Sequence, residues 1–225
     1  ETASGLVQDA GRRRITGYDG PQRSVLLVDD DADQRGFLAR FLVNCGLVVV
    51  DLPDAESALA AAQAHDFDLA ILDISLPGMS GWELAAALRA RHGHRIAIMM
   101  ASANAQEFHR PDFHSPSHDH FFIKPYRLDD MAEAIAGLLS VAWKWEAIGP
   151  VGDAAETRPG GLPAPARVHV ERLLERIQIG HVRGIEAEIA ALGKAAPSHG
   201  RLVTALYAAL DEFDLAGMTQ LLEGA

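Results

Sequence analysis

Short apolar runs alternate with stretches of helical periodicity through the first two thirds of the chain. The runs predict strands near residues 24–29, 47–51, 68–73, 96–101 and 120–124, and the periodic stretches predict helices near 32–45, 54–65, 80–92 and 128–142. Strands that alternate with helices form a parallel sheet that is wrapped by helices on both faces. The pattern therefore predicts an α/β fold with a doubly wound, five-stranded parallel sheet over residues 21–142.

The composition changes after Trp143 and Trp145. Gly, Pro, Ala and Asp are frequent from about Gly149 to Ala166, which is typical of a flexible connection, and helical periodicity then resumes. Glycines near the predicted breaks divide the periodic stretch into four short amphipathic helices. We therefore expect a linker at 143–166 and a small all-α helical C-terminal domain at 167–225. Residues 1–20 are polar and lack a period, so we interpret them as another linker, cut from a longer chain because the first residue is Glu1.

The charge and the cysteine content bear on the expected partners and on the expected cellular compartment. Acidic residues outnumber basic residues 31 to 20, and no basic stripe occurs beyond Arg12–Arg14, so we expect no nucleic acid partner. The single cysteine, Cys45, lies on the apolar side of a predicted helix, which predicts a buried thiol and fits a reducing cytoplasm. No stretch resembles a membrane span or a signal peptide. These features predict a cytoplasmic chain without direct membrane contact, whether or not its parent is attached to a membrane.

Polar side chains stand at the ends of four predicted strands. Asp29 and Asp30 follow the first apolar run, Asp73 follows the third, and Ser102 and Lys124 follow the fourth and fifth. The carboxyl ends of parallel strands meet at one edge of a sheet, so we expect these groups to converge. Three carboxylates in one place repel one another unless a cation is present, and an all-oxygen set suits Mg²⁺ better than a soft metal.

Each of these acids also has a simpler interpretation. Asp73 could be a turn residue at a strand end, and Asp30, Asp31 or Asp33 could cap the helix that follows. The joint pattern favours a site for the ordered set as a whole. For Asp31 we keep the simpler interpretation and expect a capping or solvated residue.

The ordered motifs resemble those of a known family. V-D-D, then a lone Asp before L-P-G-M-S-G, then Ser after an apolar strand, then K-P, together resemble a two-component response regulator receiver domain of the CheY-like type. The resemblance covers about residues 21–142 and implies the flavodoxin-like strand order 2-1-3-4-5.

The resemblance also assigns roles to residues. It implies that Asp73 accepts a phosphoryl group from a phosphohistidine, and that Asp29, Asp30, Asp73 and the backbone carbonyl of Ser75 hold Mg²⁺.

Two further roles concern the response to the phosphoryl group. Ser102 matches the switch hydroxyl that hydrogen-bonds this group, and Lys124 matches the cation that balances its charge. Phe121 matches an aromatic position that turns inward on activation, although plain strand packing would explain it as well.

The resemblance points to partners but leaves the parent protein open. The string Gly17-Tyr18-Asp19-Gly20-Pro21 resembles the joint after the ATP-binding domain of some hybrid sensor histidine kinases, although a trimmed stand-alone regulator would look the same. Expected partners are a histidine kinase domain, in cis or in trans, and as a further candidate a histidine phosphotransfer protein. No ATP-binding motif is visible, so the only catalysis we expect from these residues acts on their own phosphorylation and dephosphorylation. The alternative function is a pseudo-receiver or adaptor that works through protein contacts without phosphorylation.

Two segments contain histidines whose spacing could serve metal binding or phosphotransfer. Pro111 and Pro116 interrupt the region where a receiver has its fourth helix, so we expect a short helix or a loop there. The region 109–120 is rich in histidine, and a solvated loop is favoured over a transition-metal site because proline separates the one helically spaced pair. His181 precedes a basic residue and a glycine, as in phosphotransfer domains, but at different spacing, and a surface or capping histidine is favoured.

Overall fold

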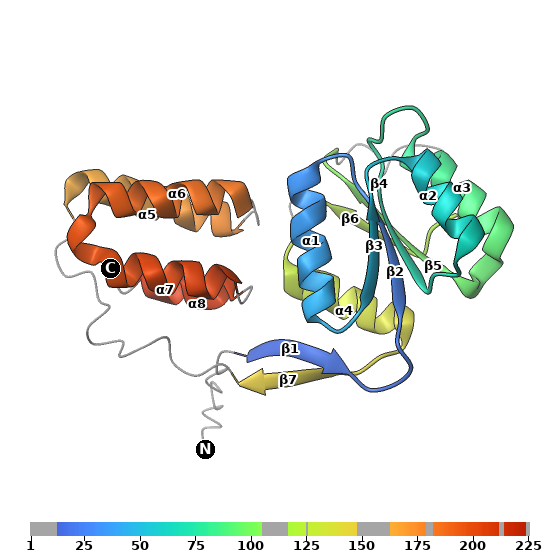
Figure 1. Ribbon diagram of the computed structural model, residues 1–225, viewed down its shortest axis with the longest axis horizontal. Helices are drawn as coiled ribbons and strands as arrows, with labels where there is room; N and C mark the ends of the chain where they lie inside the picture. The colour runs from blue at the N-terminus through green and yellow to red at the C-terminus, as the bar shows by residue number, and fades with distance from the viewer. Residues whose placement is uncertain are drawn as a thin grey trace, which may run out of the picture.

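A five-stranded parallel sheet forms the centre of the larger domain (Figure 1). The computed structural model describes residues 13–104, 117–124, 126–147, 163–178, 182–211 and 214–223. The sheet has the order β3-β2-β4-β5-β6, which is 2-1-3-4-5 when its strands are counted along the chain. The predicted fold and strand order are therefore confirmed, with strands at β2 Ser24–Val28, β3 Val48–Leu52, β4 Leu69–Asp73, β5 Ala97–Ser102 and β6 His120–Ile123.

Helices cover both faces of this sheet. Helices α1 (Ala32–Asn44) and α4 (Leu128–Leu139) pack on one face, while α2 (Ala55–Ala64) and α3 (Gly81–His92), which runs into the short 3₁₀ turn η1 (Gly93–Arg95), pack on the other (Figure 1). Strands β2 and β4 are buried on both faces because they lie between two helical layers. Cys45 is buried in the core on the α1 side, as predicted.

Polar caps start helices α1 and α3 on the carboxyl side of the strands that precede them. The side chain of Asp31 accepts hydrogen bonds from the backbone N–H groups of Asp33 and Gln34, which confirms its capping role. Ser80 and Glu83 form a capping box at the start of α3. These caps fix where each helix leaves the carboxyl edge of the sheet, and so they shape the edge where the acidic residues lie.

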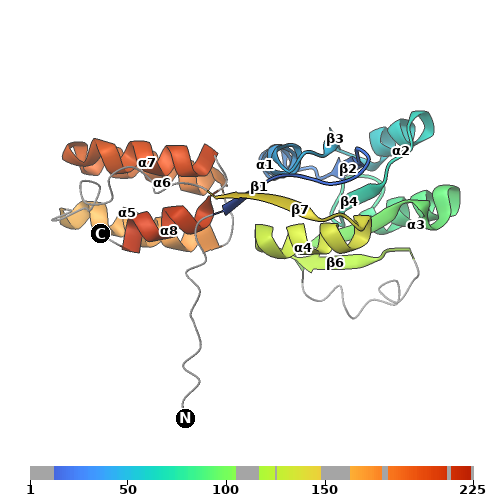
Figure 2. The same cartoon turned by 90° about the horizontal axis from the view of Figure 1, so that it is seen from below.

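A two-stranded antiparallel ribbon joins the segments before and after this domain (Figure 2). Strand β1 (Arg13–Tyr18) pairs with β7 (Trp143–Ala147), and both lie within segments predicted to be linkers. The structure therefore differs from the predicted linkers 1–20 and 143–166 at these strands. The physical reason is that each short strand gains its hydrogen-bond partners only from the other, while Ile15, Tyr18 and Trp143 pack against the core on the α1 and α4 side.

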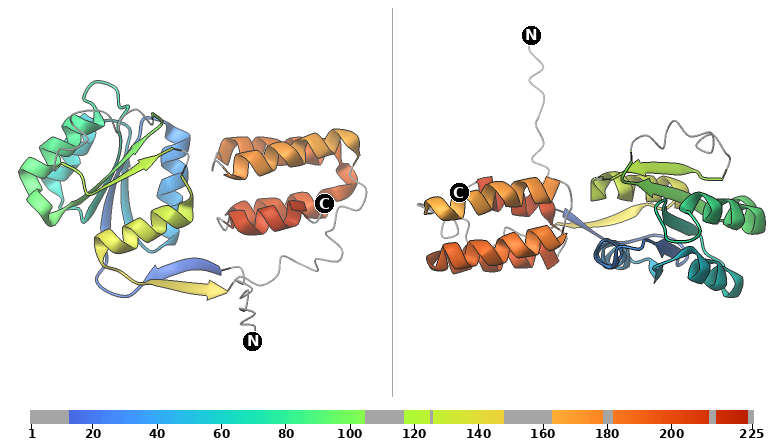
Figure 3. Two further views of the ribbon diagram at one scale, coloured as in Figure 1. Left: turned by 180° about the vertical axis from the view of Figure 1, so that it is seen from behind. Right: turned by 90° about the horizontal axis from the view of Figure 1, so that it is seen from above.

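The C-terminal region is all-helical, as predicted. Its helices are α5 (Ala164–Gln178), α6 (Val182–Ala195), α7 (Gly200–Asp211) and α8 (Leu215–Glu223), with the short 3₁₀ turn η4 (Pro197–His199) before α7. They enclose their own apolar core, which includes Leu173, Ile189 and Leu206, and they form a bundle separate from the sheet (Figure 3).

Some predictions fall on residues that the structure does not describe. These are the interrupted fourth helix with His109 and His114, and the phosphotransfer-like His181. Among the helices that are described, none is both long enough and apolar enough to cross a membrane.

Candidate functional site

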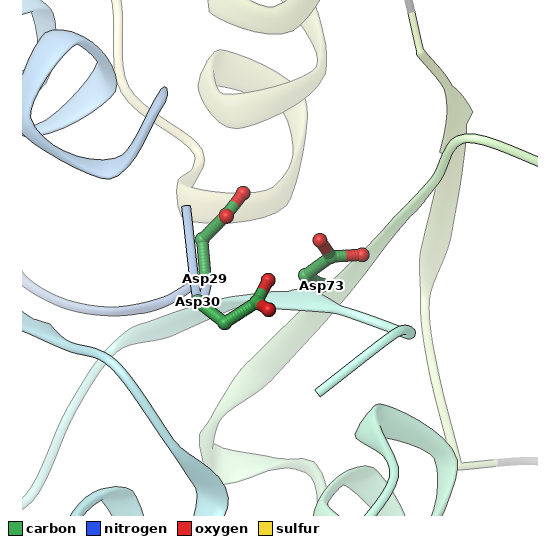
Figure 4. A group of neighbouring side chains, drawn as sticks. All are labelled: Asp29, Asp30 and Asp73. Carbon is green, nitrogen blue, oxygen red and sulfur yellow. The ribbon is translucent and has the colours of Figure 1, made fainter. Parts of the chain in front are cut away.

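Three carboxylates meet at the carboxyl edge of the sheet, where β2 and β4 end. Asp29 and Asp30 follow the last residue of β2, and Asp73 is the last residue of β4. One side-chain oxygen from each lies within 4.8 Å of the others (Figure 4). Asp29 and Asp73 are buried, while Asp30 is exposed at the mouth of the cluster. The predicted convergence of these three acids is therefore present in the structure.

Lys124 bridges the two buried acids. Its Nζ donates hydrogen bonds to Asp29 Oδ2 at 2.8 Å and to Asp73 Oδ2 at 3.0 Å. The backbone places this lysine, because its N–H donates to the carbonyl of Ser102 as β6 ends beside β5. One ammonium thus faces two buried carboxylates and a third exposed one, which leaves an excess of negative charge at the site.

Burial and charge pull the ionisation of these groups in different directions. Burial raises the pKa of Asp29 above its ordinary value of 3.8; the attraction of Lys124 opposes this rise, and repulsion from Asp73 adds to it. Burial alone would lower the pKa of Lys124, but attraction to Asp29 and Asp73 raises it above 10.5. The lysine therefore stays charged at neutral pH, whereas burial makes the charged form of Asp29 less favourable than in water.

The remaining predicted residues lie around this cluster. Ser102 is buried at the end of β5, one position beyond the residue that pairs with Asp73, and its Oγ accepts the N–H of Asn104 at 3.0 Å. Ser75 donates its backbone N–H to Asp73 Oδ1 at 3.2 Å. The metal-binding role of the Ser75 carbonyl and the phosphoryl-binding role of Ser102 stay predictions.

Phe121 lies on the opposite side of β6 from the aromatic ring of Phe122. It is half-buried and stacks on Trp82 of α3, with ring centroids 6.2 Å apart and planes 18° apart. The ring is thus already in contact with the core on the α2 and α3 side. Strand packing explains this position, and the switch role of Phe121 stays a prediction.

Sequence reasoning missed two residues that support the cluster. Arg35 donates from Nη1 to the backbone carbonyl of Asp29 at 2.7 Å. Gly81 packs so closely under Asp73 that a Cβ on it would overlap the Asp73 carbonyl oxygen. Gly81 is the last residue of the quoted motif L-P-G-M-S-G, although no role was assigned to it, whereas nothing local in the sequence singles out Arg35.

The donor set fits a hard divalent cation. All three side chains offer carboxylate oxygens, no soft sulfur or imidazole donor joins them in this group, and a single ammonium balances only part of their charge. A doubly wound parallel sheet with three clustered carboxylates and a lysine at its carboxyl edge is the arrangement expected of a signalling domain that accepts a phosphoryl group.

Comparison with known proteins gives the family. The family model described as the response regulator receiver domain matches residues 25–136. The response regulator receiver protein CpdR of Brucella abortus is 32% identical over 121 residues, which cover 53% of this chain and 99% of CpdR. The chain therefore belongs to the response regulator receiver family.

Other relatives agree with this assignment over the same part of the chain. The two-component response regulator PhoP of Pseudomonas aeruginosa is 32% identical over 115 residues, which make up 51% of this chain and 51% of PhoP. The chain thus spans about half the length of the first curated relatives that it matches. The crystal structure of a two-component response regulator from Clostridium difficile has a TM-score of 0.50 at 23% identity, covers 53% of this chain and 97% of its own, and shows the shared fold.

Proposed function

We propose that Asp73 accepts a phosphoryl group from a phosphohistidine of a histidine kinase, with Mg²⁺ bound beside it. The observation that carries this proposal is the bridge from Lys124 to both Asp29 and Asp73, with Asp30 open at the mouth of the cluster. A pseudo-receiver would have no need of two buried carboxylates, which are costly to keep charged without a function that uses them.

The chain's own residues prepare the acceptor. Ser75 N–H and Lys124 Nζ each hold one oxygen of the Asp73 carboxylate, so its orientation is set before a donor arrives. A carboxylate oxygen attacks the phosphorus, the new O–P bond forms as the P–N bond breaks, and the leaving imidazole takes a proton from solvent. Lys124 then faces the added negative charge.

Asp29, Asp30, Asp73 and the Ser75 carbonyl are the groups that would hold the metal. Mg²⁺ bound there supplies charge neutralisation for the phosphoryl oxygens. Asp29 and Asp73 are the buried members of this set, and Asp30 is its exposed member.

We propose further that the chain is the receiver portion of a hybrid histidine kinase, with the kinase domain in cis as the donor. The support is the Gly17–Pro21 string, whose first two residues are the last two of β1. Because β1 pairs with β7, the chain enters the receiver beside the segment that leaves it. A histidine phosphotransfer protein is a candidate acceptor for onward transfer. The last helices carry little basic charge, with Arg201 the lone basic residue in 201–222, so we propose an output through protein contacts and not through DNA.

Incubation with Mg²⁺ and a small acyl phosphate tests the acceptor. The expected product is a base-labile adduct that adds about 80 Da, forms only with Mg²⁺, and is absent from Asp73→Asn. Asp33→Asn is the matched control, because this acid lies in the first turn of α1 outside the three-carboxylate cluster, and it should be labelled like the wild type. Absence of the adduct from wild-type protein under these conditions would favour the pseudo-receiver instead.

A further inference from the structure

Arg35 fastens α1 to the ends of two strands. Its Nη1 donates to the backbone carbonyl of Asp29, just past β2, at 2.7 Å, and its Nε donates to Asp51 Oδ2 on β3 at 3.2 Å. The Arg35 side chain is 16% exposed, and its bond to the Asp29 carbonyl is partly buried, whereas the Asp51 side chain is 45% exposed and that bond lies at the surface. The planar guanidinium can make both bonds at once because its donors point in fixed directions.

This contact acts on the peptide between the two metal-binding candidates. The Asp29 carbonyl belongs to the same peptide plane as the N–H of Asp30, so fixing it limits the rotation of both residues. Two other bonds hold the same turn: Asp29 N–H donates to Leu52 O at 3.3 Å, and Asp31 N–H donates to Asp29 Oδ1 at 2.9 Å. Of these three, only the Arg35 bond is made by a side chain that is not itself a metal-binding candidate, so substitution can remove it without removing a carboxylate of the cluster.

We propose that Arg35 is a positioning residue for the Asp29–Asp30 pair, holding both carboxylates in the geometry that binds Mg²⁺. This inference rests on the proposed Mg²⁺-dependent function. Arg35 does not touch the metal or the phosphoryl group; it acts through the backbone of Asp29. Groups that orient metal ligands in this way often change metal affinity by a factor of about 10 or more when they are removed.

Charge and positioning predict opposite signs for the same substitution. If Arg35 acted only as a positive charge near the acids, its removal would lessen repulsion and tighten Mg²⁺ binding. If Arg35 positions the pair, its removal weakens Mg²⁺ binding despite the gain in negative charge. The direction of the change therefore separates the two roles.

Calorimetric titration of the full chain with MgCl₂ is the first measurement. We expect the Kd for Mg²⁺ to rise about tenfold in both Arg35→Gln and Arg35→Lys, because lysine keeps the charge but lacks the fork that makes both bonds. Arg40→Gln is the control, since Arg40 is exposed on the same helix and its loss removes the same charge. Arg40→Gln should bind Mg²⁺ like the wild type or slightly more tightly.

Amide hydrogen exchange without metal is the second measurement. In EDTA, the Asp31 N–H that bonds to Asp29 Oδ1 should exchange several times faster in the Arg35 variants than in the wild type or in Arg40→Gln. Unchanged exchange, or unchanged or tighter Mg²⁺ binding by a folded Arg35→Gln, overturns the inference. If wild-type protein fails to bind Mg²⁺, the proposed function fails, and the exchange measurement alone decides whether Arg35 positions this turn.

Discussion

Replacing Gly81 by alanine should displace the backbone of Asp73, the proposed phosphoryl acceptor. Gly81 is the first residue of α3, and its N–H donates to the carbonyl of Ile74 at 3.0 Å. A Cβ there would overlap the backbone carbonyl oxygen of Asp73 and would lie 2.8 Å from the Cα of Ile74. Carbon atoms in contact are separated by about 3.5–4.0 Å, so the helix and the strand end must move apart by several tenths of an ångström or more.

The size of the effect follows from this overlap. The clash involves backbone on both sides, so no side-chain rotation can relieve it, and overpacking of this kind costs about 1–3 kcal/mol of unfolding free energy. The displaced atoms belong to Asp73, whose carboxylate Lys124 holds at 3.0 Å. A shift of about 1 Å in a reacting group can lower a rate by about 100-fold. Gly81→Ala should therefore lose stability and phosphorylation rate together.

Urea denaturation and the initial rate of adduct formation with an acyl phosphate measure the two effects. Gly36→Ala is the matched control, because Gly36 lies within α1 and a Cβ there meets no atom within 4 Å. Alanine is favoured over glycine inside a helix by about 1 kcal/mol, so this control should be more stable than the wild type and be phosphorylated at an unchanged rate. The reasoning is refuted if Gly81→Ala keeps both the wild-type urea midpoint and the wild-type rate.

Three more outcomes follow from single contacts. Burial would raise the pKa of Asp68, but hydrogen bonds led by the one from the Ser24 N–H lower it below 3.8. Wild-type protein should therefore be more stable than Asp68→Asn above pH 3.8, and this difference should disappear as the pH falls through the lowered pKa. Urea denaturation at several pH values measures this difference. Trp143→Phe keeps an aromatic side chain, though a smaller one, and removes the bond from Nε1 to Ala132 O at 2.8 Å. It should lower the urea-derived unfolding free energy by at least about 1 kcal/mol, and an unchanged midpoint would contradict this. Burial raises the pKa of the Cys45 thiol to about 12, so a disulfide reagent at pH 8 should react with it only in denaturant, and fast labelling of native protein would be inconsistent with the structure.

Local signals explain why the main sheet and the acidic cluster were predictable. The apolar runs of β2 and β4 are buried on both faces, and such runs are visible in sequence without knowledge of their partners. Asp29 directly follows β2 and Asp73 is the last residue of β4, so the parallel arrangement of the two strands alone brings these acids together. The capping role of Asp31 was equally local, since it depends on the next three residues of the chain.

Features that depend on distant partners could not be predicted. Strands β1 and β7 are short and polar on one side, and each is defined by the other across the whole domain, with a register shift between Ile15 and Gly17. The bonds of Arg35 require the ends of β2 and β3 to be placed before its partners are known. The two hydrogen bonds of Lys124 are a similar case. The sequence predicted a cation at the site, and the structure shows that its ammonium group bonds to both buried acids.

The β1–β7 ribbon connects α4, the last helix of the receiver, to the strands that precede and follow the domain. Trp143 of β7 donates its indole N–H to Ala132 in α4, and its ring meets the edge of Tyr18 of β1, with centroids 5.9 Å apart. Tyr18 in turn accepts the backbone N–H of Arg23 at 2.7 Å, immediately before β2. Entry strand, exit strand and α4 thus share one set of contacts on the face of the sheet that holds α1. The chain that enters the receiver and the chain that leaves it are therefore both packed against the same apolar cluster as α4.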